Sequence, residues 1–496
     1  MDKDKVVEHY NTFKNYAYRY FKRNDIEMAV RLIKLTARIG YHYNFRYCDD
    51  DLESLISDIG LHLVSNPVSF ESQKNRTVFY DSFGNNRVLA QQYIRSLISL
   101  DLEILYIYSS KTLDSGLEKE ILGYKKSKIL KLDSNLTFSH NVKLALKEIE
   151  DFKPAIIIEH FTPWDILGFC ICSLCTSSKR YLINLTDHAF WLGKNSSDYI
   201  LEFRSYGVYL SHYHRHIPLE KLLMQPYYPI QPSVEFLGFP KEVTNDKIIL
   251  FSGSNLYKIS GKNGLFLRIV KRILDENENI IYLLAGNGNT KPIEKFIKDN
   301  NFQGRFILLG HRSDINEVIK QIDIYVNTYP MIGGLMSQYA AVNNKPIIGY
   351  SDESLYSFND TEDFLQTKTK GLLVKTSLNK FHSSLNNLIR NEKDRADNVN
   401  ITRNCVVTPE NFTKQLFNNL LYPKHIETAS IADVKIDLNS VFNLYVEMEV
   451  EFLRSHYIYI WEELKWKSFR INFLIGIISF IYKLRQFLNN KIKHCI

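Results

Sequence analysis

The spacing of apolar positions changes near residue 75. Before it, residues 24–44 read NDIEMAVRLIKLTARIGYHYN, where apolar side chains recur every three or four positions behind an Asn-Asp pair suited to cap a helix. Beyond it, short apolar runs alternate with amphipathic stretches, beginning with TVFY (77–80) and a helical stretch from Arg87. The pattern predicts a helical segment over residues 1–70, followed by alternating strands and helices.

The alternation falls into two series on either side of a proline-rich stretch. Predicted strands of the first series are TVFY, LEILYIY, AIIIEH and RYLINL, and those of the second are KIILFSG, IIYLLAG, RFILLG, IDIYVNT, KPIIGY and GLLV. Between them, residues 225–246 hold four prolines and little periodicity, as expected of a linker. The sequence therefore predicts an α/β protein with two Rossmann-like β/α domains facing a cleft, over residues 71–240 and 241–425, and a helical tail over 426–496.

Length, charge and cysteine content limit the number of domains and the classes of partner that we expect for this chain. A chain of 496 residues is long enough for two or three domains, and its net charge of +7 comes without a basic run of the kind that binds nucleic acid. The charge suits anionic small ligands or an anionic membrane face. Cys170, Cys172 and Cys175 lie in the apolar stretch ILGFCICSLC and lack a second pair of ligands, which predicts core packing and no metal site. The polar start MDKDKVVEHYNTFKNY has no apolar signal core, so we expect a cytoplasmic protein.

Small and basic residues gather where strands of the second series end. The stretch ILFSGSNLYKISGKNG (249–264) follows a strand with Gly253, Ser254, Asn255, Lys258 and Lys262, and Gly286 ends the next strand. Glycine permits a close backbone approach to a ligand, and the carboxyl ends of parallel strands share one edge of the sheet. The pattern favours a diphosphate site, although glycine also ends many strands that bind nothing.

The stretch TYPMIGGLMSQYAA (328–341) has the form strand, turn, double glycine and helix. Amide groups near Gly333, Gly334 and Ser337 are candidates to hold a phosphate at the positive end of the helix dipole. The stretch lacks both the G-K-[ST] of a P-loop and the G-x-G-x-x-G of a dinucleotide-binding turn. A kinase or a dehydrogenase is therefore not indicated.

Tandem β/α domains with a late double-glycine helix start resemble the GT-B glycosyltransferases, which take a sugar from a nucleotide-sugar bound in the cleft. More narrowly, NLYKI (255–259), the amphipathic helix after it and IIYLLAGNG resemble the donor domains of O-GlcNAc transferases and bacterial cytoplasmic adhesin glucosyltransferases. The resemblance implies a UDP-sugar donor, with Lys258 at the diphosphate and with His311 and Arg312 beside the base. Tyr339 stands where these families have a ribose-binding carboxylate, and the E-x7-E pattern of retaining enzymes is absent, which favours an inverting course.

The densest polar stretch of the first domain is LINLTDHAFWLGKNSSDYILEFRSYGVYLSHYHRHI (182–217), which resembles a segment of bacterial sugar transferases. Inverting transfer needs a base for the acceptor hydroxyl, and His188 is the preferred candidate, with Asp187 as its orienting partner or as the base itself. The alternative is a histidine that only caps a helix or satisfies a loop. Arg204 and Arg215 are candidates to bind an anionic acceptor or the diphosphate, or else they form surface salt bridges.

The loop YDSFGNN after the first strand corresponds by position to the GT-B loop that borders the acceptor and the transferred sugar. Asp81, Ser82 and Asn85 are therefore candidates to contact sugar hydroxyls. The alternative is a local role in capping the following helix.

The segment FRINFLIGIISFIYKLRQFL (469–488) is apolar but short. Only a dozen uncharged residues separate Arg470 from Lys483, too few to span a bilayer. On a helical projection the residues Asn472, Gly476, Ser479, Lys483 and Gln486 fall on one side, and a wide apolar face remains. This amphipathic helix either lies in the interface of an anionic membrane or packs on the first domain.

These observations predict a hexosyl- or related glycosyltransferase that uses a nucleotide-sugar and needs neither an obligatory cofactor nor a metal. The expected acceptor is a lipid-linked intermediate of a surface polysaccharide, such as a capsule or O-antigen, at the inner face of the cell membrane. Protein glycosylation is the variant suggested by NLYKI. A non-catalytic nucleotide-sugar-binding scaffold, and a phosphorylase or epimerase of the same fold, are the remaining alternatives.

Overall fold

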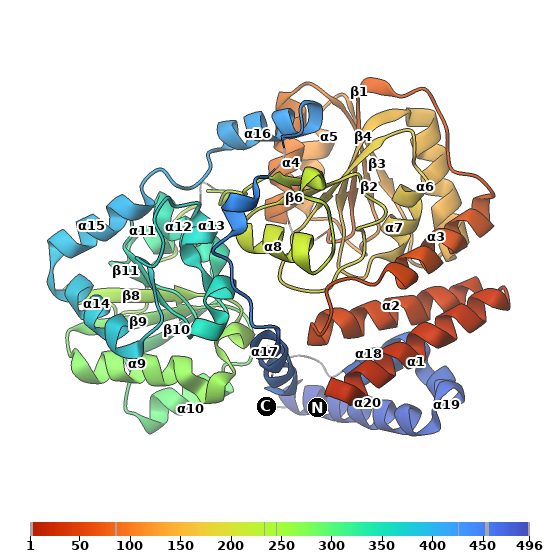
Figure 1. The fold of residues 1–496 in the computed structure, drawn as a ribbon. Helices are drawn as coiled ribbons and strands as arrows, with labels where there is room; N and C mark the ends of the chain where they lie inside the picture. Colours follow the sequence, from red (N-terminus) through yellow and green to blue (C-terminus); the bar gives the residue numbers. More distant parts are fainter. Residues whose placement is uncertain are drawn as a thin grey trace. The chain divides into compact units, whose positions relative to one another are not determined.

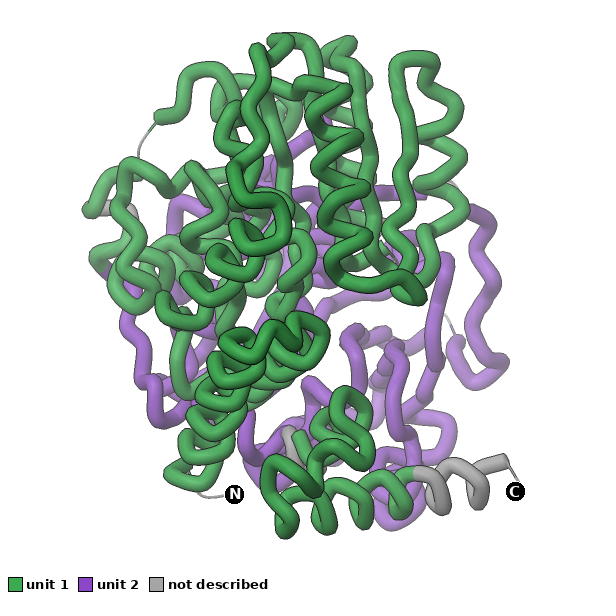
Figure 2. The backbone as a smooth tube through the Cα atoms, turned by 90° about the vertical axis from the view of Figure 1, so that its right-hand side faces the viewer, with its two compact units in different colours: residues 1–225, 410–432, 454–496 green, residues 226–409, 433–453 purple. Residues whose placement is uncertain are grey.

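A computed structural model describes residues 3–84, 87–232, 234–244, 246–424, 426–451 and 456–494. Asn85, one of the predicted sugar contacts, lies outside these residues. The chain forms two compact units, each assembled from separate segments (Figure 2). Unit 1 holds residues 1–225, 410–432 and 454–496, and unit 2 holds residues 226–409 and 433–453.

Unit 1 is built on a seven-stranded parallel sheet (Figure 1). Its strand order is β3-β2-β1-β4-β5-β6-β7, so the connections change direction between β1 and β4. Three of its strands, β3, β6 and β7, were not predicted; they are short, and β3 carries lysines at positions 128 and 131. The strands are β1 (Gln73–Asp81), β2 (Glu103–Tyr108), β3 (Ser127–Lys131), β4 (Pro154–His160), β5 (Lys179–Ile183), β6 (Tyr199–Glu202) and β7 (Leu222–Met224).

The helices of unit 1 include the predicted N-terminal helical segment and the C-terminal helix. In Figure 1 α1 and α2 lie side by side, α18 lies on α2, and α20 lies on α18. α3 packs on α7, which carries Cys170 and Cys172; these two cysteines and Cys175, just after the helix, are buried as predicted. The helices are α1 (Lys3–Lys22), α2 (Ile26–Tyr43), α3 (Asp50–Val64), α4 (Arg87–Ser99), α5 (Ser115–Leu122), α6 (Phe138–Phe152), α7 (Ile166–Ser173), α8 (Ser205–Tyr213), α16 (Pro409–Leu421), α18 (His456–Leu464), α19 (Ser468–Ile471) and α20 (Phe473–His494).

Unit 2 is a six-stranded parallel sheet of order β10-β9-β8-β11-β12-β13. Successive residues of β8 enter different cores, Leu250 on one face and Ile249 and Phe251 on the other, so helices cover both faces. The strands are β8 (Ile248–Gly253), β9 (Ile280–Ala285), β10 (Phe306–Gly310), β11 (Ile324–Val326), β12 (Ile347–Tyr350) and β13 (Val374–Lys375). The helices are α9 (Leu265–Glu276), α10 (Lys291–Asp299), α11 (Ile315–Lys320), α12 (Gly334–Val342), α13 (Thr361–Leu365), α14 (Leu378–Arg390), α15 (Glu392–Thr402) and α17 (Leu438–Glu451).

The unit boundaries differ from the sequence pattern. Residues 226–240 belong to unit 2, where the Tyr339 hydroxyl donates to the Ile230 carbonyl over 2.6 Å and the Leu237 amide donates to Asp314 over 2.9 Å. Residues 410–425 belong to unit 1, where the Gln415 side chain donates to the Met224 carbonyl over 2.7 Å. These contacts join segments far apart in sequence, which periodicity does not reveal. No helix in the described ranges combines the length and apolar character needed to cross a membrane.

Candidate functional site

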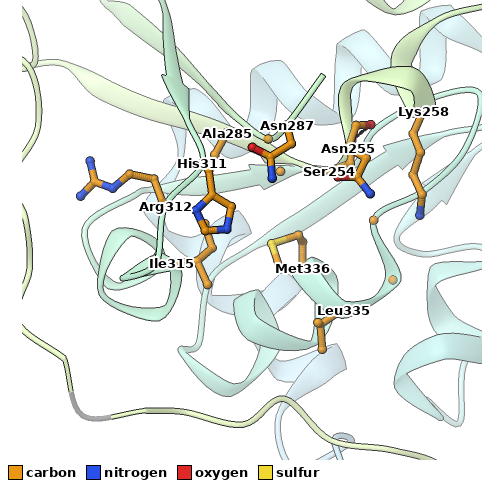
Figure 3. Close-up of a pocket in the computed structure, with 14 residues that line it drawn as sticks. Ser254, Asn255, Lys258, Ala285, Asn287, His311, Arg312, Ile315, Leu335 and Met336 are labelled. Atoms are coloured by element: carbon orange, nitrogen blue, oxygen red, sulfur yellow. Dashed lines mark hydrogen bonds between the residues drawn. The ribbon is translucent and has the colours of Figure 1, made fainter. Parts of the chain in front are cut away.

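A cavity of about 380 Å³ opens at the carboxyl edge of the unit 2 sheet (Figure 3). It lies at the topological switch point, where the loops after the neighbouring strands β8 and β11 diverge, the usual ligand position in open α/β sheets. The lining brings together most of the predicted donor residues. They are Gly253, Ser254, Asn255, Lys258, Gly286, His311, Arg312, Gly333 and Gly334, joined by Ala285, Asn287, Ile315, Leu335 and Met336, which were not predicted.

Two glycines allow the loops around the cavity to come close. A Cβ at Gly286, whose φ is +156°, would lie 1.7 Å from the Ser254 carbonyl oxygen. A Cβ at Gly333 would lie 2.5 Å from the Gly253 carbonyl oxygen. Neither contact is possible for a larger residue, so Gly286 lets the end of β9 approach the loop after β8, and Gly333 lets the double-glycine turn approach the end of β8.

The side chain of Lys258 places its ammonium group beside the double-glycine turn. It belongs to a short 3-10 helix, η2 (Leu256–Ile259), whose Lys258 carbonyl accepts a hydrogen bond from the Met331 amide at 3.3 Å. Its Nζ donates to the Ile332 carbonyl over 3.2 Å, directly before Gly333. In Figure 3 Lys258 lies at one end of the cavity and His311 and Arg312 lie at the other. The ammonium is therefore placed where α12 begins.

The N-terminus of α12 opens toward this cavity. Gly333, the N-cap residue, has no side chain, and within the described structure no side-chain hydrogen bond caps the helix. The first amides of a helix lack partners inside it, and the helix dipole makes this end positive. Gly334, Leu335 and Met336, the first residues of α12, all line the cavity. Of the described residues that line it, none is Asp or Glu, so the lining suits an anion.

Two buried asparagines that the sequence analysis missed shape the turn before α12. The Asn327 Oδ1 accepts from the amides of Thr328 and Gly333, both over 3.0 Å, and its Nδ2 donates to Ser337 Oγ over 2.9 Å. Asn359, fully buried, accepts from the Ile332 amide over 3.2 Å. Asn327 directly follows β11, and this position after a strand is a signal that the sequence pattern contains. Asn359 belongs to a segment that is distant in the sequence. Both are positioning residues for the turn.

Three of the residues predicted to bind the nucleotide-sugar do not take the positions that their expected roles require. Ser337 is fully buried and bonds Asn327 beneath the turn, so it supports the loop and does not line the cavity. Lys262 pairs with Asp352 at 3.2 Å, away from the lining. Arg312 lines the cavity, but its guanidinium forms a bidentate pair with Asp314, and in Figure 3 it points outward. That pairing, the largest influence on Asp314, lowers the pKa of its carboxyl.

Tyr339 occupies the sequence position of the ribose-binding carboxylate. Its side chain is buried, and its hydroxyl donates to the Ile230 carbonyl. Burial raises the pKa of Tyr339 to about 12. The residue therefore ties α12 to residues 226–240 and stands outside the cavity lining.

In unit 1 Asp187 and His188 form a hydrogen-bonded pair after β5. Asp187 Oδ1 lies 3.1 Å from His188 Nδ1, although adjacent side chains usually diverge. Burial alone would raise the pKa of Asp187, but the charge of Arg204 and hydrogen bonds from His188 and Arg204 lower it to about 2. An ionised carboxylate only accepts, so His188 Nδ1 must donate, and Nε2 carries the lone pair when the imidazole is neutral. The His188 side chain is 25% exposed, against 1% for Asp187.

Arg204 and Arg215 are internal to this cluster. Arg204 is ion-paired with Asp187, and its guanidinium lies 4.5 Å from the centre of the Tyr206 ring. Arg215, fully buried, donates to the carbonyls of Asp187 and Ala189 over 2.8 and 2.7 Å. Both guanidinium groups hold the loop around Asp187. The alternative of surface salt bridges required exposed side chains, and neither side chain lies on the surface.

The N-terminal helical segment supports the same loop, which sequence reasoning missed. Asn44, the left-handed C-cap of α2, donates from Nδ2 to the His188 carbonyl over 2.8 Å. Glu53 on α3, fully buried, accepts from the amides of Gly193, Lys194 and Asn195 at 2.8–3.2 Å. Burial raises the pKa of Glu53 to about 7, against the opposing effect of these amides. The segment thus fixes both ends of the loop that carries His188.

Asp81 and Ser82 lie at the switch point of the unit 1 sheet. Asp81 is 1% exposed and accepts from His160 Nδ1 over 2.9 Å, from the Tyr106 hydroxyl over 2.6 Å and from the amides of Phe83 and Gly84. Ser82 Oγ accepts from the Thr162 amide over 2.6 Å. These bonds join the loops after β1 and β4, so both side chains act locally in the structure as it stands.

Neither the protein-family models nor the curated proteins searched gave a match to the sequence. Among solved structures, the Anabaena Alr3699/HepE protein in complex with UDP and glucose is 11% identical, with a TM-score of 0.50 over 70% of this chain and 99% of its own. A Thermobaculum terrenum O-GlcNAc transferase mutant is 14% identical, with a TM-score of 0.48 over 90% of this chain and 85% of its own.

The described residues contain no group of three or more His, Cys, Asp or Glu side chains arranged to hold a metal ion.

Two parallel Rossmann-like sheets, each with a switch point, agree with the structural match to Alr3699/HepE. The predicted fold is confirmed: the chain has the GT-B fold.

Proposed function

We propose that the protein transfers a sugar from a nucleotide-diphospho-sugar to a hydroxyl group. The observation that carries this proposal is the cavity of unit 2, where the open start of α12, the Lys258 ammonium and a lining without carboxylates converge. Each feature favours a diphosphate, because amides and a cation both stabilise phosphate oxygens. The same groups stabilise the diphosphate as a leaving group, and no metal is required for that role.

A uridine nucleotide is the favoured donor. The Alr3699/HepE protein, which shares the fold, was solved in complex with UDP and glucose. His311 is exposed at the end of the cavity away from Lys258, which leaves the phosphates near Lys258 and the base near His311. Arg312 contributes its backbone and aliphatic stem to that end, since Asp314 holds its guanidinium.

We assign the base to His188 and its orientation to Asp187. In an inverting transfer the acceptor oxygen bonds to the anomeric carbon while the bond to the diphosphate breaks, and the hydroxyl proton passes to His188 Nε2. The Asp187 carboxylate, ionised at neutral pH, stabilises the imidazolium that forms and fixes the tautomer. This pairing supports the inverting course that the missing E-x7-E pattern suggests.

For the acceptor we favour a lipid-linked intermediate of a surface polysaccharide, used at the cytoplasmic face of the membrane. Its support is the basic and apolar C-terminal segment, which offers a means of reaching lipid-linked substrates. A protein acceptor is the alternative. Product analysis with both acceptor classes separates them, because only one will carry the labelled sugar.

The test begins with thermal shifts of the full chain in UDP, GDP, CDP and TDP and their sugars. A ligand that binds only the folded state raises its apparent stability, so we expect UDP species to raise the melting temperature. Donor hydrolysis should follow, abolished by Lys258→Ala and by His188→Ala. If no nucleotide moves the midpoint, the donor site is refuted. If nucleotides bind but no donor turns over, the protein is a nucleotide-sugar-binding scaffold.

A further inference from the structure

The C-terminal helix α20 presents its apolar face outward. Its small and polar side, with Gly476 and Ser479, is buried beside α18 and α19, and Lys483 pairs with Glu462 of α18 at 3.0 Å. A Cβ at Gly476 would lie 2.8 Å from the Phe469 ring, so the glycine permits this close packing. On the other side Phe473 and Leu474 are 68% and 64% exposed. The helix therefore packs on unit 1 and still leaves its larger apolar side uncovered.

The exposed side chains continue along the helix and over the turn before it. Leu474, Ile481 and Leu484 recur at helical spacing, with Phe480 and Tyr482 also exposed. Scattered apolar residues are normal on a protein surface, but a continuous stripe of this kind marks an interaction site.

Aromatic rings gather at the start of the stripe. Trp466 is 66% exposed, and its ring lies 5.0 Å from that of Trp461, 5.7 Å from that of Phe469 and 5.7 Å from that of Phe480. Amphipathic aromatic rings favour the boundary between water and lipid, where one part is wet and the other is apolar.

The charged residues of the tail segment itself have one sign. Residues 465–496 contain seven Lys or Arg and no Asp or Glu. Lys465, Lys467, Arg470 and Arg485 are exposed around the apolar stripe. A second copy seated on this face in a symmetric dimer would place the same cations opposite one another. A negatively charged, apolar surface complements both properties.

We propose that this tail surface binds an anionic lipid bilayer, with α20 lying in the plane of the interface. The tail surface comprises Trp466, Phe473, Leu474, Phe480, Ile481 and Leu484 with the surrounding Lys465, Lys467, Arg470 and Arg485. The apolar side chains enter the headgroup boundary, and the cations contact lipid phosphates or carboxylates. This binding needs no sugar transfer, so it stands apart from the proposed enzymatic activity and identifies the surface that reaches the membrane.

The test is co-sedimentation of the full chain, without nucleotide, with vesicles of phosphatidylcholine alone or mixed with phosphatidylglycerol. Two double variants probe the surface, Lys465→Glu with Lys467→Glu and Phe473→Ser with Leu474→Ser. All four side chains are exposed, so the fold should survive. Matched controls are Lys143→Glu with Lys147→Glu on α6, and Leu122→Ser, 64% exposed on α5.

We expect binding to anionic vesicles that weakens with salt and falls by about tenfold or more in each tail variant, while the controls bind like the wild type. Failure of the wild type to bind anionic vesicles would overturn the proposal, as would equal binding by the tail variants. A dimer that Phe473→Ser with Leu474→Ser abolishes, without vesicle binding, would assign the surface to a second copy. Donor hydrolysis measured on the same variants without vesicles should be unchanged, which separates this proposal from the enzymatic one.

Discussion

The cavity of unit 2 and the polar cluster of unit 1 both follow parallel strands, yet they are built in opposite ways. The cavity is walled by glycine backbone and by side chains such as Lys258 and Asn255 that reach the opening. In the cluster Asp187, Arg204 and Arg215 are at most 2% exposed and bind the protein itself. A polar residue after a strand thus lines a cavity in one unit and forms an internal support in the other. The difference predicts that substitutions of the buried cluster residues Asp187, Arg204 and Arg215 act on stability, and that substitutions in the unit 2 cavity act on binding.

The largest effect should come from Asp187→Ala. The change leaves the buried Arg204 guanidinium without its carboxylate, and breaking a buried ion pair in this way destabilises a protein by about 3–5 kcal/mol. Chemical denaturation monitored by tryptophan fluorescence gives the free energy of unfolding. Asp275→Ala, which breaks an exposed pair with Lys271 on α9, is the control and should change it little. An equally small loss for both variants would show that the cluster is not the internal support inferred here.

The next effect should fall mainly on ligand binding. Lys258→Ala removes the proposed charge-assisted hydrogen bond to the diphosphate and should weaken UDP binding by about ten- to a hundredfold, while loss of the bond to the Ile332 carbonyl lowers the unfolding free energy by about 1 kcal/mol at most. Isothermal titration measures the affinity. Lys262→Ala removes a lysine from the same loop that pairs with Asp352 instead, so it should bind UDP almost like the wild type. Equal losses in the two variants would contradict the assignment of the diphosphate to Lys258.

The comparison also separates what the sequence could reveal from what it could not. The buried strands of unit 2 and the residues at their carboxyl ends repeat a local pattern, so the cavity could be predicted from β8, β9 and the double glycine. Asn359 and Glu53 reach their loops from positions distant in sequence, and a single chain without contacts gives no sign of them. Likewise, a helical projection of α20 identifies its two faces but not which face packs inward.

Side-chain orientation was the other limit. Ser337 was expected at the phosphate because it lies in the first turn of α12, but helix geometry directs it beneath the turn toward Asn327. Arg312 was expected at the base, yet Asp314, two residues on, captures its guanidinium. Sequence position indicates the loop on which each residue lies, whereas local hydrogen-bonding partners decide where its side chain points.

A pH dependence of stability should come from buried carboxyl groups of unit 1. Burial raises the pKa of Glu159 to about 8, so between pH 4.5 and 8 the folded state holds a proton that the unfolded state has released. The contribution of Glu159 to the free energy of unfolding therefore falls as the pH rises through that window, by at most about 1.4 kcal/mol per pH unit. Glu53 and Glu202, whose pKa values burial raises to about 7, act in the same direction.

Glu159→Gln should remove this component, so its unfolding free energy should fall less steeply than that of the wild type between pH 5 and pH 8. Denaturation curves across the range measure the slope. Glu150→Gln, at an exposed position of α6, is the matched control and should keep the wild-type slope. Parallel slopes for wild type and Glu159→Gln would show that this carboxyl titrates normally and that the interior around it is wetter than its burial indicates.

The smallest effect tests whether unit 1 contributes a positioned base as well as a support. Asn44→Gly keeps the left-handed backbone, at φ 51°, but removes the amide that holds the His188 carbonyl. We expect a loss of about 1 kcal/mol in stability and a few-fold fall in kcat, with the UDP affinity of unit 2 unchanged. Asn24→Gly, at φ 60° in the same helical segment, is the control, since its side chain bonds His62 and not the loop. A fall in UDP affinity, or the same fall in kcat for Asn24→Gly, would remove the positioning role, because either result would mean that the segment acts on the whole protein and not through His188.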